Sequence, residues 1–331
     1  MLPDMHMPAH NVERFPLIAY VHVPKAGGTT VNEVLWSCSP RGLKHYQEGV
    51  PRPKLLDVAL RNDWLSGHIP REVFANALIW LGRPIEYFSA VREPVAQLLS
   101  HLNWAWEIHN RGADFLRGYP RPRLEVSEQV RATDFSKPSA IIELLLRLER
   151  RYLNCQARYI LGAEYNTISD GELARRVASF TYIATEQDLP ALYRAFGFAA
   201  LPKESNKLRE NSAQKYYFDT SVFESKEIVD FLAEHHSHDF RVYECILKTS
   251  WSAGSRHPIR PAFPFVTADN YDEQGYLANN PDVAKALKTH KTWRSGRDHF
   301  LACGRREQRR QLLLPPAEVP ALGERAQIGG V

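Results

Sequence analysis

Long apolar runs and closely spaced cysteines are both missing from this chain of 331 residues. No stretch approaches the roughly 18 uninterrupted apolar residues that a membrane span requires, and the N-terminal MLPDMHMPAHNVERF has no apolar signal region. We therefore expect a cytoplasmic protein, and a peripheral position at the inner membrane stays open. The cysteines, Cys38, Cys155, Cys245 and Cys303, lie far apart without a C-x-x-C, which favours buried free thiols over a zinc knuckle or a disulfide framework.

The chain also lacks a strong excess of charge of either sign. Its 42 Lys and Arg residues face 38 Asp and Glu residues, a formal net charge of +4. This balance does not indicate a nucleic-acid partner, although local groups of basic residues could bind an acidic cofactor or glycan. The 44% of hydrophobic and 24% of charged residues are typical of a globular protein, long enough for one large α/β core and an appendage.

Shifts in composition divide the chain into five segments. These are a flexible N-terminus (1–14), a main domain (15–249), a linker rich in Ser, Pro and Arg (250–264), a small helical module (265–310) and a disordered tail (311–331). The module shows three short amphipathic patterns, and Pro281 stands at the start of the second.

The most informative stretch is Phe15 to Leu35, FPLIAYVHVPKAGGTTVNEVL. Leu17 to Val23 is apolar and bounded by two prolines, which predicts a short buried strand. Gly27 and Gly28 allow backbone N–H groups to approach a ligand, and the two threonines that follow open a helix whose unpaired amides attract phosphate or sulfate. Nucleoside triphosphatases place the lysine after the last glycine, in G-x-x-x-x-G-K-[ST], whereas Lys25 precedes both glycines here. The order therefore disfavours ATP.

The alternation of strands and helices continues after this stretch. The sequence predicts helices at 29–36, 55–61 and 71–77, an extended segment ending at His68, a buried strand at 85–91 and a helix from Pro94 to about His109. This order predicts an α/β, P-loop-NTPase-like three-layer fold with a mainly parallel sheet, whose ligand lies beyond the carboxyl ends of the strands. The loops at Lys25 and Arg92 both lie at such ends.

The region from 119 to 247 is predicted to be mostly helical. We expect a surface loop able to act as a lid at 118–137, helices at 139–152, 170–179, 189–196, 222–235 and 239–247, a strand at 181–185, and a polar loop at 203–211 that could cover a phosphate.

Two motifs resemble the donor site of sulfotransferases that use 3′-phosphoadenosine-5′-phosphosulfate (PAPS). His22 to Thr30, HVPKAGGTT, resembles the phosphosulfate loop of that family. Ser89 to Val95, SAVREPV, with Ser100 beyond it, is similar to the second signature, in which a serine follows eight residues after the arginine. Because Ser100 lies about two helical turns beyond Arg92 on the same side, both side chains can reach one phosphate.

Further features resemble the carbohydrate branch of the family, particularly the uronyl and heparan 2-O-sulfotransferase group. That group carries a G-H whose histidine is the proposed base, and Ser66-Gly67-His68 matches it. Asn154 to Gly162 is similar to the N-x-Q-x-R helix of the family, and Tyr182 to Leu189 contains T-E-x-x-L. The resemblance covers about Phe15 to Leu247 and departs at Gln97, where relatives often carry a basic residue.

The resemblance implies in-line transfer of a sulfuryl group from PAPS to a carbohydrate hydroxyl, without a metal and with 3′-phosphoadenosine 5′-phosphate (PAP) as the product. His68 would take the hydroxyl proton, and Lys25 would neutralise charge on the departing oxygen. The 5′-phosphosulfate would be bound by Lys25, Ala26, Gly27, Gly28, Thr29 and Thr30, and the 3′-phosphate by Arg92 and Ser100.

Several alternatives stay open. A nucleotide kinase or other phosphoryl transferase would need G-K-[ST] and a magnesium-binding carboxylate, and a non-catalytic binding module would tolerate substitutions at Lys25, Arg92 and His68. His68 could also be a structural histidine, and the rival bases are then Glu93, Glu107 and His109.

Three other features are open to more than one interpretation. His235-His236-Ser237-His238 falls between two predicted helices, which favours cationic capping of a helix over a metal site. Trp104 and Trp106 cannot both face the core from one helix, so one could stack on a sugar ring. The C-terminal module resembles short helical units attached to bacterial glycan-handling enzymes, which implies a bacterial protein and a role of the module in docking or assembly.

Overall fold

The computed structural model describes residues 16–39, 42–47, 55–56, 58–59, 62–79, 81, 84–196, 215–251, 271–289, 292–307, 309 and 311. The predicted flexible N-terminus, polar loop 203–211 and C-terminal tail beyond 311 lie outside these residues, as do most of the linker and part of the helix predicted at 55–61. Contacts divide the chain into two compact units, Met1–Arg260 and Pro261–Val331.

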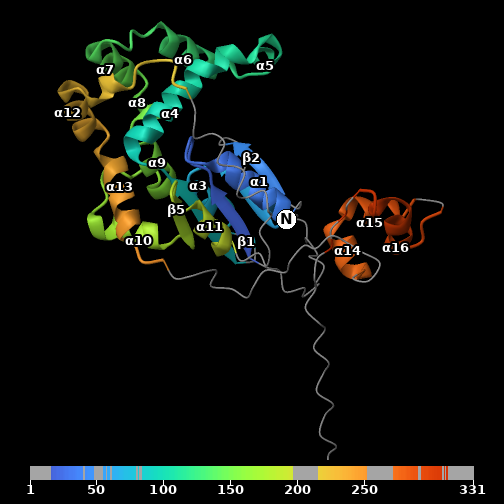
Figure 1. Cartoon of the computed structure of the whole chain (residues 1–331). Coiled ribbons are helices and arrows are strands. Elements are labelled where there is room, and N and C mark those ends of the chain that lie inside the picture. The colour runs from blue at the N-terminus through green and yellow to red at the C-terminus, as the bar shows by residue number, and fades with distance from the viewer. Residues whose placement is uncertain are drawn as a thin grey trace, which may run out of the picture. The chain divides into compact units, whose positions relative to one another are not determined.

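The larger unit is built on a five-stranded, all-parallel sheet with the strand order β2-β3-β1-β4-β5 (Figure 1). The strands are β1 (Leu17–Val21), β2 (Gly42–Gln47), β3 (Trp64–His68), β4 (Ile85–Val91) and β5 (Tyr182–Thr185). The predicted α/β class with a parallel sheet is confirmed. Strand β2 was missed because its sequence, GLKHYQ, carries no apolar run.

Helices cover both faces of this sheet. Side chains alternate along a strand, so Leu17, Ala19 and Val21 of β1 face one layer, while Ile18 and Tyr20 face the other. The first layer contains α3 (Arg71–Ala77), α9 (Cys155–Leu161), α10 (Asp170–Ala178) and α13 (Ser237–Lys248), and the second contains α1 (Gly28–Cys38) and α11 (Leu189–Ala195). Burial on both faces explains why the central strands are continuously apolar.

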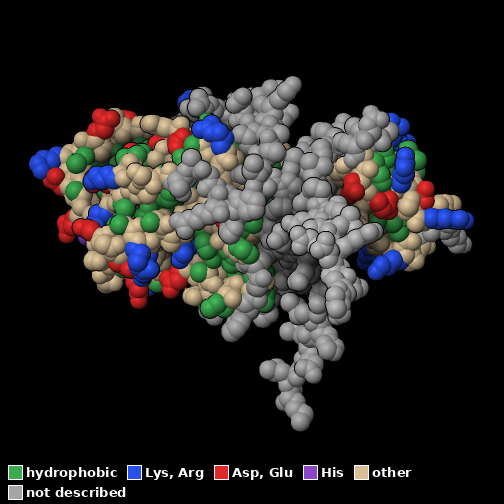
Figure 2. Space-filling model, turned by 90° about the horizontal axis from the view of Figure 1, so that it is seen from below, with side chains coloured by type: hydrophobic (Ala, Val, Ile, Leu, Met, Phe, Trp, Pro, Cys, Tyr) green, Lys and Arg blue, Asp and Glu red, His purple; other side chains and the backbone are tan. Residues whose placement is uncertain are grey.

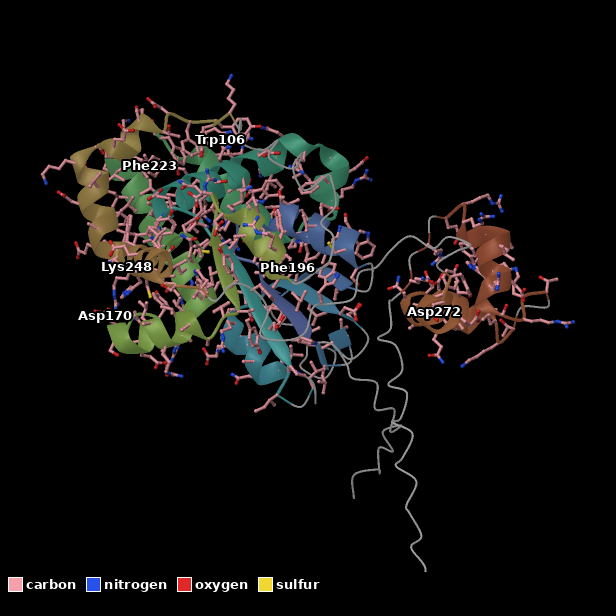
Figure 3. All side chains as sticks on the ribbon, turned by 60° about the horizontal axis from the view of Figure 1, so that its bottom comes forward. Trp106, Asp170, Phe196, Phe223, Lys248 and Asp272 are labelled. Carbon is pink, nitrogen blue, oxygen red and sulfur yellow. The ribbon has the colours of Figure 1, made fainter. Side chains whose placement is uncertain are left out.

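A separate cluster of helices stands beyond one end of the sheet (Figure 1). Its elements are α4 (Pro94–Glu107), η1 (Ile108–Arg111), α5 (Ala113–Arg117), α6 (Arg121–Ala132), α7 (Pro138–Arg147), α8 (Glu149–Tyr152), η4 (Ser221–Glu224) and α12 (Lys226–His235). Figure 3 shows Trp106 and Phe223 among these helices, whereas Phe196 lies beside the sheet. Since α4 begins just after β4, the cluster adjoins the carboxyl end of the sheet.

The surface loop predicted at 118–137 is wrong, because residues Arg121–Ala132 form helix α6. Pro122 lies in the first turn, where its missing N–H removes no hydrogen bond of the helix. In the sequence, the same proline is typical of a loop. Val126 and Val130 face the helical cluster, and the Ser127 hydroxyl donates a hydrogen bond to the Ala105 carbonyl. In the sequence, the charged residues around these few buried ones obscure the helical pattern.

The smaller unit contains short helices around a compact apolar centre. They are α14 (Glu273–Asn279), α15 (Pro281–Ala286), α16 (Gly296–His299) and a π-helical continuation, η5 (Phe300–Gly304). Pro281 occupies the first turn of α15, as predicted. Tyr276, Val283 and Phe300 form the core, and the Tyr276 hydroxyl lies 2.8 Å from Nδ1 of His299.

The structure also bears on the predictions for the cysteines, for membrane-spanning helices and for surface charge. All four cysteines are free, but only Cys38 and Cys155 are buried, while Cys245 and Cys303 are partly exposed. Among the described helices, none has the length and apolarity needed to cross a bilayer. On the face drawn in Figure 2, basic and acidic side chains are interspersed over the described surface of the larger unit.

Candidate functional site

A cavity of about 1580 Å³ lies at the carboxyl end of the sheet in the larger unit. Its lining includes every residue that the sequence assigns to donor binding or catalysis, namely Lys25, Ala26, Gly27, Gly28, Thr29, Thr30, His68, Arg92 and Ser100. These residues come from segments that follow β1, β3 and β4. The cavity therefore occupies the position at which parallel α/β sheets bind ligands.

The loop after β1 presents the first turn of α1 to the cavity. Gly27 is the N-cap residue and has a φ of 83°, in the left-handed region that glycine adopts without strain. A Cβ atom on Gly28 would lie 1.9 Å from Nε2 of His22, so only glycine fits there. Gly27 itself has no side chain to cap this helix end, and the first turn holds no acidic residue. The dipole of α1 therefore favours an anion at this end of the helix.

Lys25 has a strained backbone and a partly desolvated ammonium group. Its φ of 63° is uncommon for a residue with a Cβ, and such strain concentrates at functional sites. The ammonium lies 4.9 Å from the ring centroid of Trp104. Burial lowers the pKa of Lys25 most, and Arg111 and Arg92 lower it further, while Glu107 opposes them. An anion in the cavity would relieve this crowding of positive charge.

The two tryptophans of α4 face different surroundings. Trp104 lines the cavity, where the guanidinium carbon of Arg111 lies 4.4 Å from its ring centroid. Trp106 packs into the helical cluster and stacks with Tyr217 at 6.3 Å between ring centroids. The prediction that only one of them joins the core is therefore confirmed. Stacking of Trp104 on a sugar stays a prediction.

His68 is the last residue of β3, and its imidazole orientation is determined by a backbone contact. Its Nδ1 lies 2.8 Å from the His22 carbonyl oxygen, which can only accept, so Nδ1 carries the hydrogen and Nε2 holds the lone pair. Burial lowers the pKa of His68 to about 4, with further lowering by His45 and Arg123 and an opposing effect of the His22 carbonyl. His68 is therefore an unprotonated proton acceptor at neutral pH.

Three imidazoles gather beside the loop, those of His22, His45 and His68. One nitrogen of each lies within 4.8 Å of the other two, a spacing at which three histidines could bind one metal ion. The rings of His22 and His68, however, are stacked with centroids 4.2 Å apart and planes 30° apart. Lone pairs lie in the ring plane, so two stacked rings do not direct them at one ion. We interpret His22 as a support for His68.

Arg92 and Ser100 lie where the second motif predicts, at the end of β4 and on α4. The backbone N–H of Arg92 donates to Oε1 of Gln156, and its carbonyl accepts from Nε2 of Gln156, both at 2.8 Å. Ser100 is buried and lines the cavity. The sequence anticipates the arginine and the serine, but not the amide that holds the arginine backbone.

The rival bases lie outside the cavity, and two of them have other partners. The carboxylate of Glu93 accepts the backbone N–H groups of Val95 and Ala96 at 3.1 and 2.7 Å, capping α4. Glu107 forms an ion pair with Arg111 at 2.7 Å. Neither these two carboxylates nor His109 line the cavity. Among the candidate bases, His68 is the residue whose ring faces it.

Gln97 does not line the cavity but supports it from behind: it is buried, and its Nε2 donates to the Pro24 carbonyl at 2.8 Å, so it anchors the loop before Lys25.

Several further residues that do line the cavity were not predicted as site residues. The other wall of the cavity is basic and aromatic, with Phe115, Tyr119, Arg123, Arg150, Arg151 and Arg158. These residues come from α5, the turn before α6, α6, α8 and α9, and only Arg158 belongs to a pattern noted in the sequence, N-x-Q-x-R.

No protein-family model matches the chain, and a search of curated proteins finds no match. The functional assignment therefore depends on the residues of the cavity and their geometry.

Gly28→Ala should weaken binding of inorganic pyrophosphate by about tenfold, because the added methyl group must displace the His22 ring or the first turn of α1 and so disturb the anion site; tenfold corresponds to about 1.4 kcal/mol of binding free energy. Calorimetry would measure the affinity. Gly118→Ala is the matched control, since the nearest atom to its Cβ would be 3.9 Å away. Equal affinities of the two variants would contradict an anion site at this helix end.

Proposed function

We propose that the larger unit transfers a sulfuryl group from PAPS to a hydroxyl group of a carbohydrate. The observation that carries the proposal is that the Lys25 loop, the Arg92–Ser100 pair and His68 line one cavity. Two cationic anion-binding elements on separate loops suit a nucleotide that is charged at both its 5′ and its 3′ end. The resemblance of both motifs to the PAPS-dependent family supports the same interpretation.

In this proposal the first turn of α1 binds the 5′-phosphosulfate. The amides of Gly28, Thr29 and Thr30 and the two threonine hydroxyls, which belong to residues that line the cavity, would donate hydrogen bonds to it. The guanidinium of Arg92, with the Ser100 hydroxyl, binds the 3′-phosphate. Donor binding would thus neutralise cations that the free protein holds close together.

The chemical step needs a base and a group that stabilises the leaving oxygen. Nε2 of His68 takes the proton of the acceptor hydroxyl while the hydroxyl oxygen bonds to sulfur. At the same time the bond from sulfur to the bridging oxygen of the 5′-phosphate breaks. The Lys25 ammonium stabilises the negative charge that appears on that oxygen. The proton ends on His68, and the products are the sulfate ester and PAP.

The acceptor would occupy the part of the cavity that Trp104, Phe115 and Tyr119 line. Its wall offers the stacked rings of Phe115 and Tyr119, with centroids 5.0 Å apart, and the face of Trp104. Aromatic faces and hydrogen-bonding side chains suit a sugar ring. The proposal includes a cytoplasmic bacterial setting, with the C-terminal unit acting in docking or assembly.

His68→Ala should reduce the transfer of labelled sulfate from PAPS to a panel of oligosaccharides by about 10²- to 10⁴-fold, the usual contribution of a general base. The affinity for PAP should change less than about twofold, since the imidazole is assigned to the acceptor side. His109→Ala is the control, because His109 does not line the cavity. Unchanged turnover in His68→Ala would remove the base assignment.

The pH profile of kcat/KM tests the same groups in the free protein. Because burial lowers the pKa of His68 to about 4, kcat/KM should fall only as the pH drops toward that value, well below 6.5. On the alkaline side it should fall as Lys25 loses its proton, below the usual 10.5 of lysine. An acid limb centred at 6.5 would contradict the role given to the buried His68.

A further inference from the structure

Gln156 forms two hydrogen bonds to the backbone of one residue, Arg92. It is 1% exposed, and its amide both accepts the Arg92 N–H and donates to the Arg92 carbonyl. The pairing of β4 with β5 ends at Val91 and Thr185, so Arg92 lies just beyond the strand ladder. The amide of Gln156 therefore supplies the partners that the ladder no longer provides.

The backbone of Gln156 is itself held by a buried carboxylate. Asp239 of α13 is fully buried and accepts the backbone N–H groups of Gln156 and Ala157 at 3.2 and 2.6 Å. These are amides at the start of α9, where a negative charge is favourable. Burial raises the pKa of Asp239, and its contacts with His236 and the two backbone amides oppose that rise.

Asn154 links the same helix start to the corner between α12 and α13. Its backbone has a φ of 52°, and its Nδ2 donates to the His235 carbonyl at 2.7 Å. Its Oδ1 accepts the backbone N–H groups of His238 and Asp239 at 3.1 and 3.3 Å. The left-handed conformation is thus stabilised by three side-chain contacts.

His236 completes this network and corrects the prediction made for the cluster at 235–238. Its Nδ1 accepts the backbone N–H of Asn154 at 2.8 Å, which places the ring hydrogen on Nε2, 3.6 Å from Asp239 Oδ2. His236 is fully buried. It therefore acts as a hydrogen-bond acceptor between helices rather than as a cationic helix cap.

We infer that Gln156 is a positioning residue for the 3′-phosphate half of the donor site, acting by holding the backbone of Arg92. The inference rests on the proposed function. Loss of the amide leaves the backbone N–H and carbonyl of Arg92, which are partly buried, without these partners, and they can regain others only if the peptide turns. Such a turn redirects the guanidinium, so the effect should appear in recognition of the 3′-phosphate and not of the nucleotide as a whole.

The test compares PAP with adenosine 5′-phosphate (AMP), which lacks the 3′-phosphate, by calorimetry. Gln156→Leu should weaken the binding of PAP by about 10- to 100-fold, which corresponds to the loss of one charge-assisted phosphate contact. It should change the affinity for AMP by less than about twofold. Gln156→Glu can accept the Arg92 N–H but cannot donate to its carbonyl, so its affinity for PAP should lie between those of the wild-type protein and Gln156→Leu. If Gln156→Leu does not fold, Gln156→Glu provides the test.

Two other buried amides provide comparisons. Asn103 makes the same kind of double contact, donating to the Lys215 carbonyl at 3.4 Å and accepting from the Tyr217 N–H at 2.9 Å, but does not line the cavity. Asn103→Leu should therefore leave the ratio of PAP to AMP affinity unchanged. Gln97→Leu should weaken both ligands equally, because Gln97 anchors the loop for the 5′ end.

The outcomes separate this inference from the function on which it rests. If the wild-type protein binds PAP no better than AMP, the 3′-phosphate site and the proposed donor fail. If the wild-type protein prefers PAP and Gln156→Leu retains that preference, or weakens both ligands equally, the positioning role of Gln156 is overturned while the donor assignment stands.

Discussion

The arrangement of the cavity depends on the buried side chain of His22. Its ring fills the space beside Gly28 that a Cβ would need, and stacks on His68 at 4.2 Å. Its carbonyl accepts the Nδ1 hydrogen of His68 at 2.8 Å. One residue thus determines both how closely the anion-binding loop can approach β1 and which nitrogen His68 offers to a substrate. His22 therefore contacts both the anion-binding loop and the proposed base.

A second constraint is electrostatic. Burial lowers the pKa of both Lys25 and His68, and neighbouring cations add to the effect on each of them. Holding positive groups together in a desolvated cavity is unfavourable in the free protein, and a polyanionic ligand would offset that cost. Buried amides, Gln97 for the loop and Gln156 for Arg92, anchor the backbone of the two elements. This arrangement supports the proposal of a ligand that carries charge at two points.

The sequence predicts the parts of this site that local signals encode. The segment from Leu17 to Leu35 and the turn at Arg92 follow from short-range patterns of apolar residues, proline and glycine, and the structure has them as strand, loop and helix. Contacts between distant residues leave no such signal: the His68–His22 bond joins residues 46 apart, and the Gln156–Arg92 bonds join residues 64 apart. Strand β2 was missed because its sequence carries no apolar run, and helix α6 because charged residues surround the few that it buries.

Binding of PAP is the most direct test of the account, and calorimetry in the presence of a chelator would measure it. The account predicts that PAP binds without any divalent metal, and more tightly than ATP with magnesium, because Lys25 stands before the glycines and the loop with Arg92 supplies the charge that a metal would otherwise provide. No binding of PAP, or equal binding of ATP with magnesium, would contradict the donor assignment and favour a phosphoryl transferase.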